Sequence, residues 1–388
     1  MKKKSIYIIS LFLLSLWLAS CNSDVKPTTE TKKTVQQEQE VKKETKTEDN
    51  KNKEEASTPK KNEVKEINIV TDRSDSHLTT IAKQFEEETW VKVNISRIDK
   101  WLLSKIENRE NEGDIYITKS STEIIKAADK DLLAKIPADL VANVDDLHKG
   151  DEWVNMSFRD RAFYIKKGVK DFPHTYEGLA NPKWKGKLCI RPLTHHYNIE
   201  MISNMLVKHG EEYTKAWLDG LIKNMARKPT WNDRAQVKGI YDGVCEFSVW
   251  NTYYMGLMLE NPEQKPWADN VNLFFPNQEV KDEEHVDGAI ALYSAIGVNK
   301  NSINKKPVQE FLIYVLSPAS QQLITDATYE YPIVKDVPVE NEIVKDFGKF
   351  QNLKPNEIKQ TTISQEETAK VRDQVLKIIS EAEMKNGL

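Results

Sequence analysis

Residues 66–118 read EINIVTDRSDSHLTTIAKQFEEETWVKVNISRIDKWLLSKIENRENEGDIYIT, and their apolar pattern decides the fold class. Three short segments have the apolar or alternating composition of strands, namely 67–70, 91–95 and 113–118. Two segments between them have helical spacing of apolar residues, namely 78–88 and 101–108. Strands that alternate with helices indicate an α/β protein with a parallel sheet. Because ligands of such sheets bind beyond the carboxyl ends of the strands, the loop after Val70 is a candidate ligand loop.

The remaining chain continues this α/β character. Further strands are expected at 163–165, 187–191, 246–250 and 290–298. Further helices are expected at 176–179, 199–208, 211–223, 233–242, 255–259, 307–316 and 319–325, with a long amphipathic helix at 365–385. The roughly 320 residues from Glu66 onward are enough for two domains, each with its own core.

The first residues have the order of a bacterial lipoprotein signal. Lys2, Lys3 and Lys4 precede an apolar run that is too short for a membrane span, and Leu18-Ala19-Ser20-Cys21 follows. These four residues resemble a lipobox, in which the cysteine is lipidated and becomes the new N-terminus. We therefore expect residues 1–20 to be removed and Cys21 to anchor the protein to the membrane by lipid alone. The alternative is an ordinary signal peptide with a chance cysteine.

Residues 21–65 predict a disordered linker. After Cys21 the segment consists almost entirely of charged and polar residues, it contains no aromatic residue, and valine is its only bulky apolar type. Such a composition cannot bury enough apolar surface to offset the entropy of ordering the chain. The linker is expected to hold the folded body away from the lipid surface.

Charge and motifs exclude several function classes. The formal net charge is −4, so no basic excess points to nucleic acid. Standard catalytic, phosphate-loop and zinc motifs are absent from the sequence, so we expect no enzyme. The adjacent pair His195-His196 would point to opposite faces of a strand, and on spacing alone both are expected in a loop or at the surface.

Two cysteines remain after Cys21, and their state is left open by the sequence. Cys189 and Cys245 both lie in strand-like segments. An extracytoplasmic, oxidising compartment permits a disulfide bond between them, whereas two buried free thiols are the alternative.

Tyrosines follow two of the predicted strands. Tyr253 and Tyr254 come directly after the segment 246–250, and Tyr197 comes shortly after 187–191. A phenolate oxygen is a hard anionic donor that suits a hard trivalent cation, and a bound metal ion displaces the phenol proton near neutrality. From spacing alone, packing is the favoured explanation for the tyrosine pair.

Six segments in the same order resemble one family. Asn251-Thr252-Tyr253-Tyr254-Met255-Gly256 looks like the N-T-Y-Y-hydrophobic-G motif of the ferric-iron-binding substrate-binding proteins of ABC transporters. The others are NPKWKGK (181–187) with CIR (189–191), Tyr197-Asn198, NDRAQ (232–236), FFPNQ (274–278) and YEYP (329–332). The resemblance covers about residues 67–340.

The resemblance implies a two-lobed periplasmic-binding-protein fold of class II type behind a disordered tether. The expected parts are a first lobe at 66–155 to which about 285–340 return, a second lobe at 156–284, and a C-terminal region at about 341–388 that packs on the lobes. It also implies a monomer outside the cytoplasm that closes around ferric iron and delivers it to an ABC permease and its ATPase.

The resemblance implies a ligand set as well. By the matched motif Tyr253 and Tyr254 are the central metal ligands, Tyr197 matches a further tyrosine ligand, and Arg161 is expected to hold a carbonate or another synergistic anion. A salt bridge at the surface or hinge is the alternative role of Arg161. The first loop departs from the family, because Ser74 and Asp75 stand where many members have histidine and tyrosine ligands.

Asp75 is a hard oxygen donor that would replace the missing phenolate, and His77 is a second candidate whose alternative is a solvated loop position. The leading function is thus capture of ferric iron. The runner-up is a solute-binding protein of the same fold for another metal, an anion or a small organic molecule. A surface enzyme or adhesin is a third class, for which the sequence shows neither a nucleophile with its base nor repeats.

Overall fold

The computed structural model describes residues 65–73, 75–98, 102–108, 113–279 and 288–388. The predicted signal peptide (1–20), the lipidation site Cys21 and almost all of the predicted tether lie outside the described residues. Ser74 also lies outside them, and for Asp75 and His77 only the backbone is described. Within the described part of the chain, no helix is both long and apolar enough to cross a membrane.

The stretch that decided the fold class forms the predicted alternation of elements. Its strands are β1 (Glu66–Thr71), β2 (Lys92–Arg97) and β3 (Ile115–Thr118), and its helices are α1 (Asp75–Thr89) and α2 (Leu102–Glu107). Strand β1 lies between β2 and β3 and pairs in parallel with both. Because all three strands point the same way, their carboxyl ends meet at one edge of the sheet.

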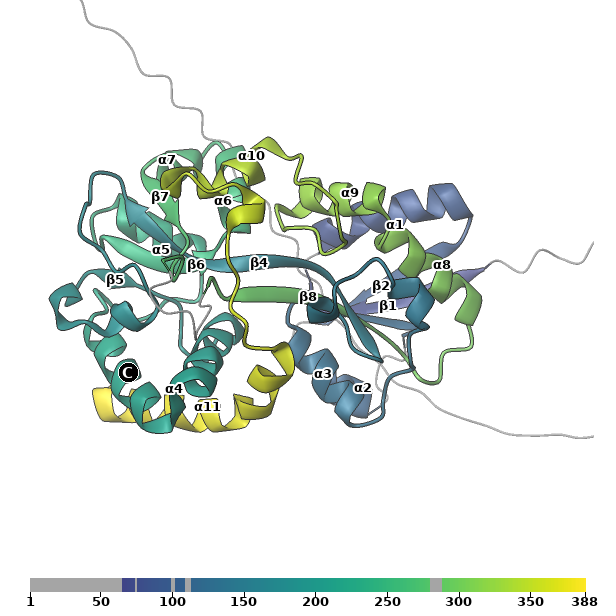
Figure 1. The fold of residues 1–388 in the computed structure, drawn as a ribbon, viewed down its shortest axis with the longest axis horizontal. Coiled ribbons are helices and arrows are strands. Elements are labelled where there is room, and N and C mark those ends of the chain that lie inside the picture. Colours follow the sequence, from purple (N-terminus) through teal and green to yellow (C-terminus); the bar gives the residue numbers. More distant parts are fainter. Residues whose placement is uncertain (1–64, 74, 99–101, 109–112, 280–287) are drawn as a thin grey trace, which may run out of the picture. The chain divides into compact units, whose positions relative to one another are not determined.

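Two long strands connect this part of the sheet to the rest. Strand β4 (Trp153–Lys166) runs antiparallel to β8 (Ala291–Val298) over its first half, with a bulge between Asn155 and Ser157. Figure 1 shows the two strands side by side. Over its second half β4 pairs with β6 and β7 instead. The lobe boundary expected at 155/156 therefore falls inside one continuous strand, of which the sequence predicted only 163–165.

The second part of the sheet contains β5 (Leu188–Cys189), β6 (Phe247–Asn251) and β7 (Val271–Phe274). The strand order is β2-β1-β3-β8-β4-β6-β5, and β7 pairs with β4. We call the β1–β3 end lobe 1 and the β5–β7 end lobe 2. Strand β7 was not among the expected strands, and β5 is shorter than the expected 187–191.

Helices cover both lobes. The remaining α-helices are α3 (Ser121–Asp129), α4 (His196–Lys223), α5 (Arg234–Tyr241), α6 (Tyr253–Glu260), α7 (Lys265–Ala268), α8 (Lys305–Val315), α9 (Pro318–Thr328), α10 (Glu342–Lys345) and α11 (Gln365–Asn386). The 3₁₀ helices are Ala138–Val141, Asp146–His148, Glu177–Ala180, Pro182–Trp184, Asp346–Gln351 and Pro355–Glu357. The two helices expected at 199–208 and 211–223 are the two arms of α4, and they are separated at Gly210, whose φ of +77° and ψ of 177° are not helical.

The terminal helix α11 packs on both lobes. Ala369, near its start, belongs to an apolar cluster of lobe 1, whereas Val375 and Ile379 belong to the main core of lobe 2. Its neighbours are accordingly α3 and α4. In Figure 1 the yellow helix α11 lies against α4. The amphipathic pattern at 365–385 therefore reflects a helix with one buried face.

The two cysteines left open by the sequence form a disulfide bond, Cys189–Cys245, which links the end of β5 to the residues just before β6. Both are buried, and they lie 56 residues apart in the chain. Closing a loop of this length stabilises the folded state by about 4 kcal/mol in the chain-entropy model.

We therefore expect the double variant Cys189→Ala and Cys245→Ala to lose about 4 kcal/mol of unfolding free energy. Guanidinium unfolding followed by circular dichroism measures the loss, and reduced wild-type protein should unfold at a similarly lowered concentration. An unchanged unfolding midpoint for the double variant would contradict a stabilising bond.

Candidate metal centre

A cavity of about 540 Å³ lies where the strand ends of lobe 1 face lobe 2. Lobe 1 contributes residues at or just after the carboxyl ends of β1, β2 and β3, namely Asp72, Arg73, Arg97 and Lys119. The other lining residues are Arg159, Arg191, His195, His196, Tyr197, Asp233, Arg234, Tyr253, Tyr254, Leu257 and Glu330. The loop after β1 thus faces the cavity, at the edge where open α/β sheets bind ligands.

The structure brings the three candidate tyrosines together. Tyr197 lies in the first turn of α4, and Tyr253 and Tyr254 begin α6. The hydroxyl oxygens of Tyr197 and Tyr253 are 3.3 Å apart, and the rings of Tyr253 and Tyr254 stack at 4.0 Å.

Neighbouring contacts hold the Tyr-Tyr motif in place. The Thr252 amide donates to the backbone oxygen of Asp160 on β4 at 3.0 Å, and the Asp160 amide donates back to the Thr252 hydroxyl at 3.2 Å. Gly256 faces the ring of Tyr329, and a Cβ there would lie 2.2 Å from the ring carbon Cγ. The glycine of the motif is therefore required by the close approach of Tyr329.

The buried phenols are held in their protonated form. Burial raises the pKa of Tyr253 and of Tyr254 well above the ordinary tyrosine value, and Tyr197 and Asp233 raise both further. An incoming cation must therefore supply enough electrostatic energy to displace the phenol protons.

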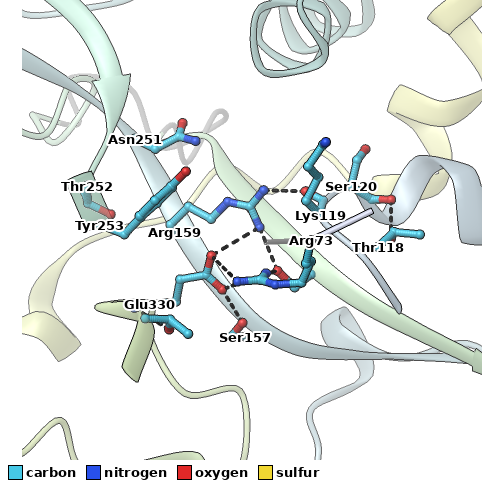
Figure 2. Close-up of polar contacts among 12 residues, drawn as sticks. Arg73, Thr118, Lys119, Ser120, Ser157, Arg159, Asn251, Thr252, Tyr253 and Glu330 are labelled. Carbon is cyan, nitrogen blue, oxygen red and sulfur yellow. Dashed lines mark hydrogen bonds and ion pairs between the residues drawn. The ribbon is translucent and has the colours of Figure 1, made fainter. Parts of the chain in front are cut away.

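Basic side chains outnumber acidic ones around the cavity. Six Arg and Lys residues and three carboxylates are found among its described lining residues. Two of the arginines share the Glu330 carboxylate. Arg73 donates to it from both terminal guanidinium nitrogens, each at 3.2 Å, and a terminal nitrogen of Arg159 lies 3.8 Å from it. Figure 2 shows both guanidinium groups directed at Glu330. The network leaves an excess of positive charge beside the tyrosines.

Arg161, the residue expected to bind an anion, does not line the cavity. Its guanidinium is fully buried and donates to Asn251 at 2.9 Å and to Asn198 at 2.7 Å, so it is not a surface or hinge salt bridge either. The arginine that reaches the cavity is Arg159, two residues earlier on β4.

The histidine pair lies at the cavity, with His195 in the loop before α4, as expected, and His196 in the first turn of the helix. His195 caps α4, accepting from the Tyr197 amide at 3.3 Å, and His196 is the first helical residue. Burial, together with the positive charges of nearby Arg191, Arg161 and Lys119, lowers the pKa of His195 to about 2. Burial also lowers the pKa of His196 well below the ordinary value. Both rings are therefore neutral near pH 7.

Sequence reasoning left all three carboxylates of the cavity without a role, Glu330 and the two that follow. Asp72 pairs with Lys119, and Asp233 accepts a hydrogen bond from the Tyr254 hydroxyl at 2.7 Å. The NDRAQ segment that contains Asp233 was recognised, but nothing in its spacing placed it beside Tyr254. Among the described residues, no group of three His, Cys, Asp or Glu side chains is arranged to hold a metal ion.

A family model described as bacterial extracellular solute-binding protein matches residues 114–361, well over half of the chain. The chain belongs to this family of bacterial extracellular solute-binding proteins. This membership agrees with the mixed α/β architecture, and it assigns the chain to a family of solute-binding proteins.

Three similar proteins have names or titles that mention iron. Iron uptake protein A1 of Synechocystis is 33% identical over 308 residues, covering 76% of this chain and 83% of the relative. The crystal structure of apo ferric ion-binding protein A from Pasteurella haemolytica is 30% identical, with a TM-score of 0.74 and coverage of 82% and 98%. A Trichodesmium protein in complex with iron and citrate is 28% identical, with a TM-score of 0.72 and coverage of 82% and 99%.

Proposed function

We propose that this solute-binding protein captures ferric iron through the phenolate oxygens of Tyr197, Tyr253 and Tyr254. The observation that carries the proposal is the meeting of these three phenols on one wall of the cavity, with two of their oxygens 3.3 Å apart. Phenolate is a hard anionic donor that suits a trivalent cation. Similar proteins named for iron uptake and ferric iron binding support the same cargo.

The cavity walls from both lobes support a closing mechanism. Tyrosines of lobe 2 hold the ion first, and groups after β1 and β3 complete its surroundings. Ligation energy then favours the closed arrangement. Asp75 and His77 remain proposed ligands from lobe 1, with Asp72 of the same loop at the cavity wall.

The positive charge of the cavity favours an anion that binds together with the iron. The excess of basic side chains around the described cavity opposes a bare cation, whereas an anion such as carbonate or a carboxylate chelator would be attracted. Arg159 and Lys119 line the cavity and would contact that anion, and Arg161, which was expected to do so, supports the motif from behind through Asn251. The relative in complex with iron and citrate supports this part of the proposal.

The same proposal includes delivery of the iron to an ABC permease and its ATPase. The family description places such proteins outside the cytoplasm. Lipidation at Cys21 would keep the protein near its permease, and the polar linker would let it dock. Extraction of cells with a detergent that dissolves lipoproteins, followed by mass spectrometry of the mature N-terminus, tests this part.

Ferric nitrilotriacetate titrated into the full-length protein tests the cargo. We expect a visible phenolate-to-iron absorption band and a smaller radius of gyration in X-ray scattering. A colourless mixture with unchanged scattering would contradict the proposal. Manganous and ferrous ions are parallel probes, and thermal stabilisation by one of them but not by ferric ion would favour another metal.

Ferric binding should weaken as the pH falls. Because burial raises the pKa of Tyr253 and Tyr254, the metal-free phenols carry their protons at neutral pH, and each phenolate ligand formed releases one proton. Each unit of lower pH then weakens the apparent affinity about tenfold per phenol, or about a hundredfold for these two. Competition against a chelator of known protonation measures how the ferric affinity changes with pH. An affinity that stays constant between about pH 6 and 8 would contradict phenolate ligation.

A further inference from the structure

Glu200 is a buried carboxylate of lobe 2 that contacts lobe 1. It lies in the first arm of α4 and is only 8% exposed. The Ser120 hydroxyl donates to Glu200 Oε1 at 3.2 Å, and the Thr122 hydroxyl donates to the same oxygen. Both donors stand at the start of α3, a helix whose apolar side chains belong to a cluster of lobe 1. These hydrogen bonds therefore cross from one lobe to the other, and we call them the α3–α4 tie.

A third helix reaches the same carboxylate oxygen. Arg372 of α11 places a guanidinium nitrogen 3.7 Å from Glu200 Oε1. Helix α11 packs on both α3 and α4, and Figure 1 shows its start next to α3. A cavity beside Glu200 has a volume of about 20 Å³, which is room for about one water molecule. The three helices are therefore closely packed around a carboxylate whose burial requires such partners.

The tie lies directly behind two residues that line the large cavity. Lys119, which precedes Ser120 in the chain, lines that cavity from lobe 1, and Tyr197 lines it from lobe 2. Glu200 follows Tyr197 by three residues in α4, and residues with this spacing lie on the same face of a helix. A movement of lobe 1 away from α4 would therefore separate Lys119 from Tyr197 and break the tie.

We propose that Glu200 is a positioning residue that ties α3 to α4 and thereby favours the arrangement in which both lobes face the bound iron. The effect on iron rests on the proposed ferric function, whereas the tie itself belongs to the metal-free protein. One hydrogen bond to a charged group changes an equilibrium constant about tenfold or more. Without the tie, a larger share of the molecules has its lobes apart, and ligation energy is then used to bring them together.

X-ray scattering of the metal-free, full-length protein tests the tie without iron. We expect Glu200→Gln and Thr122→Val each to increase the radius of gyration, because one removes the charge and the other removes a donor of nearly unchanged shape. All variants carry the same residues 1–64, so a difference between them reports the lobes. Glu212→Gln is the matched control, because Glu212 is exposed on the second arm of the same helix. A wild-type radius of gyration in both test variants would overturn the proposal.

Ferric affinity is the second readout, measured by competition with nitrilotriacetate. We expect Glu200→Gln and Thr122→Val each to weaken binding about tenfold, while the visible band keeps its wild-type position because all three tyrosines remain. A residue that only stabilised the fold would lower the unfolding midpoint and leave the radius of gyration and the ferric affinity unchanged. Unchanged or tighter ferric binding in the two variants would therefore overturn the positioning role.

The double variant shows whether the two residues act through one contact. If they do, Glu200→Gln causes little further loss of affinity once Thr122→Val is present, whereas losses that add fully would overturn the tie. If circular dichroism shows that Glu200→Gln does not fold, Thr122→Val carries the scattering and affinity measurements, and the same results overturn the inference. Failure of the proposed function is recognised separately, since wild-type protein would then give no ferric band while the scattering comparison still tests the tie.

Discussion

A protein with both Tyr253→Phe and Tyr254→Phe gives no visible band when ferric nitrilotriacetate is added. The two substitutions remove two of the three phenol oxygens that meet at the cavity wall. Histidine cannot replace them, because His195 and His196 are neutral nitrogen donors and a trivalent cation prefers hard anionic oxygen. The loss of ferric affinity should exceed the roughly ten- to hundredfold loss that follows removal of a residue that only orients a metal ligand.

The fold should survive this double substitution. Phenylalanine keeps the stacked rings beside Trp250, and Asp233 keeps its contacts with Trp250 and Arg191. The matched control is Tyr213→Phe with Tyr241→Phe, because both of these tyrosines are exposed and distant from the described cavity lining. A coloured complex of wild-type intensity in the Tyr253/Tyr254 double variant would exclude these phenols as ligands.

Replacing Glu330 by alanine should destabilise the protein by about 3–5 kcal/mol. Glu330 is 2% exposed and is the carboxylate shared by Arg73 and Arg159, and the Ser157 hydroxyl also donates to it. Removing it leaves two buried guanidinium groups beside a cavity that already has excess positive charge. Breaking a buried ion pair from one side costs this much because the remaining charge is uncompensated.

Guanidinium unfolding of the metal-free protein measures this effect. Glu330→Gln should lose less than Glu330→Ala, since the amide oxygen still accepts hydrogen bonds although the charge is gone. Glu342→Ala serves as the exposed control, because Glu342 pairs with Lys345 at the surface and such pairs contribute little. A change below about 1 kcal/mol for Glu330→Ala would show that the arginine network does not require its carboxylate.

The α/β alternation of residues 66–118 was predicted correctly, element by element, because it depends on periodicities that neighbouring residues carry. The helix 365–385 was predicted for the same reason. The strand β7 and the full length of β4 were missed, because both depend on pairing with distant strands. Residue types near Trp153 do not reveal that β8, more than a hundred residues later, will pair with them.

The roles of the two arginines on β4 show the same limit. Arg159 pairs opposite Leu292 of β8, and Arg161 pairs opposite Asn251 of β6, so the partner of β4 changes between them. That change places Arg159 at the cavity and buries Arg161 behind the tyrosine motif. Sequence alone could identify a basic residue before a strand but could not tell which arginine reaches the cavity.

Local patterns and a short motif in the sequence were enough to predict the α/β class, the family resemblance and the candidate ligands Tyr197, Tyr253 and Tyr254. The groups that surround these phenols became known from the folded chain alone. It placed Asp233 at the Tyr254 hydroxyl, joined Cys189 to Cys245, and packed Tyr329 against Gly256. These contacts join segments far apart in the chain, and their formation depends on burial and strand pairing that no local window of sequence contains.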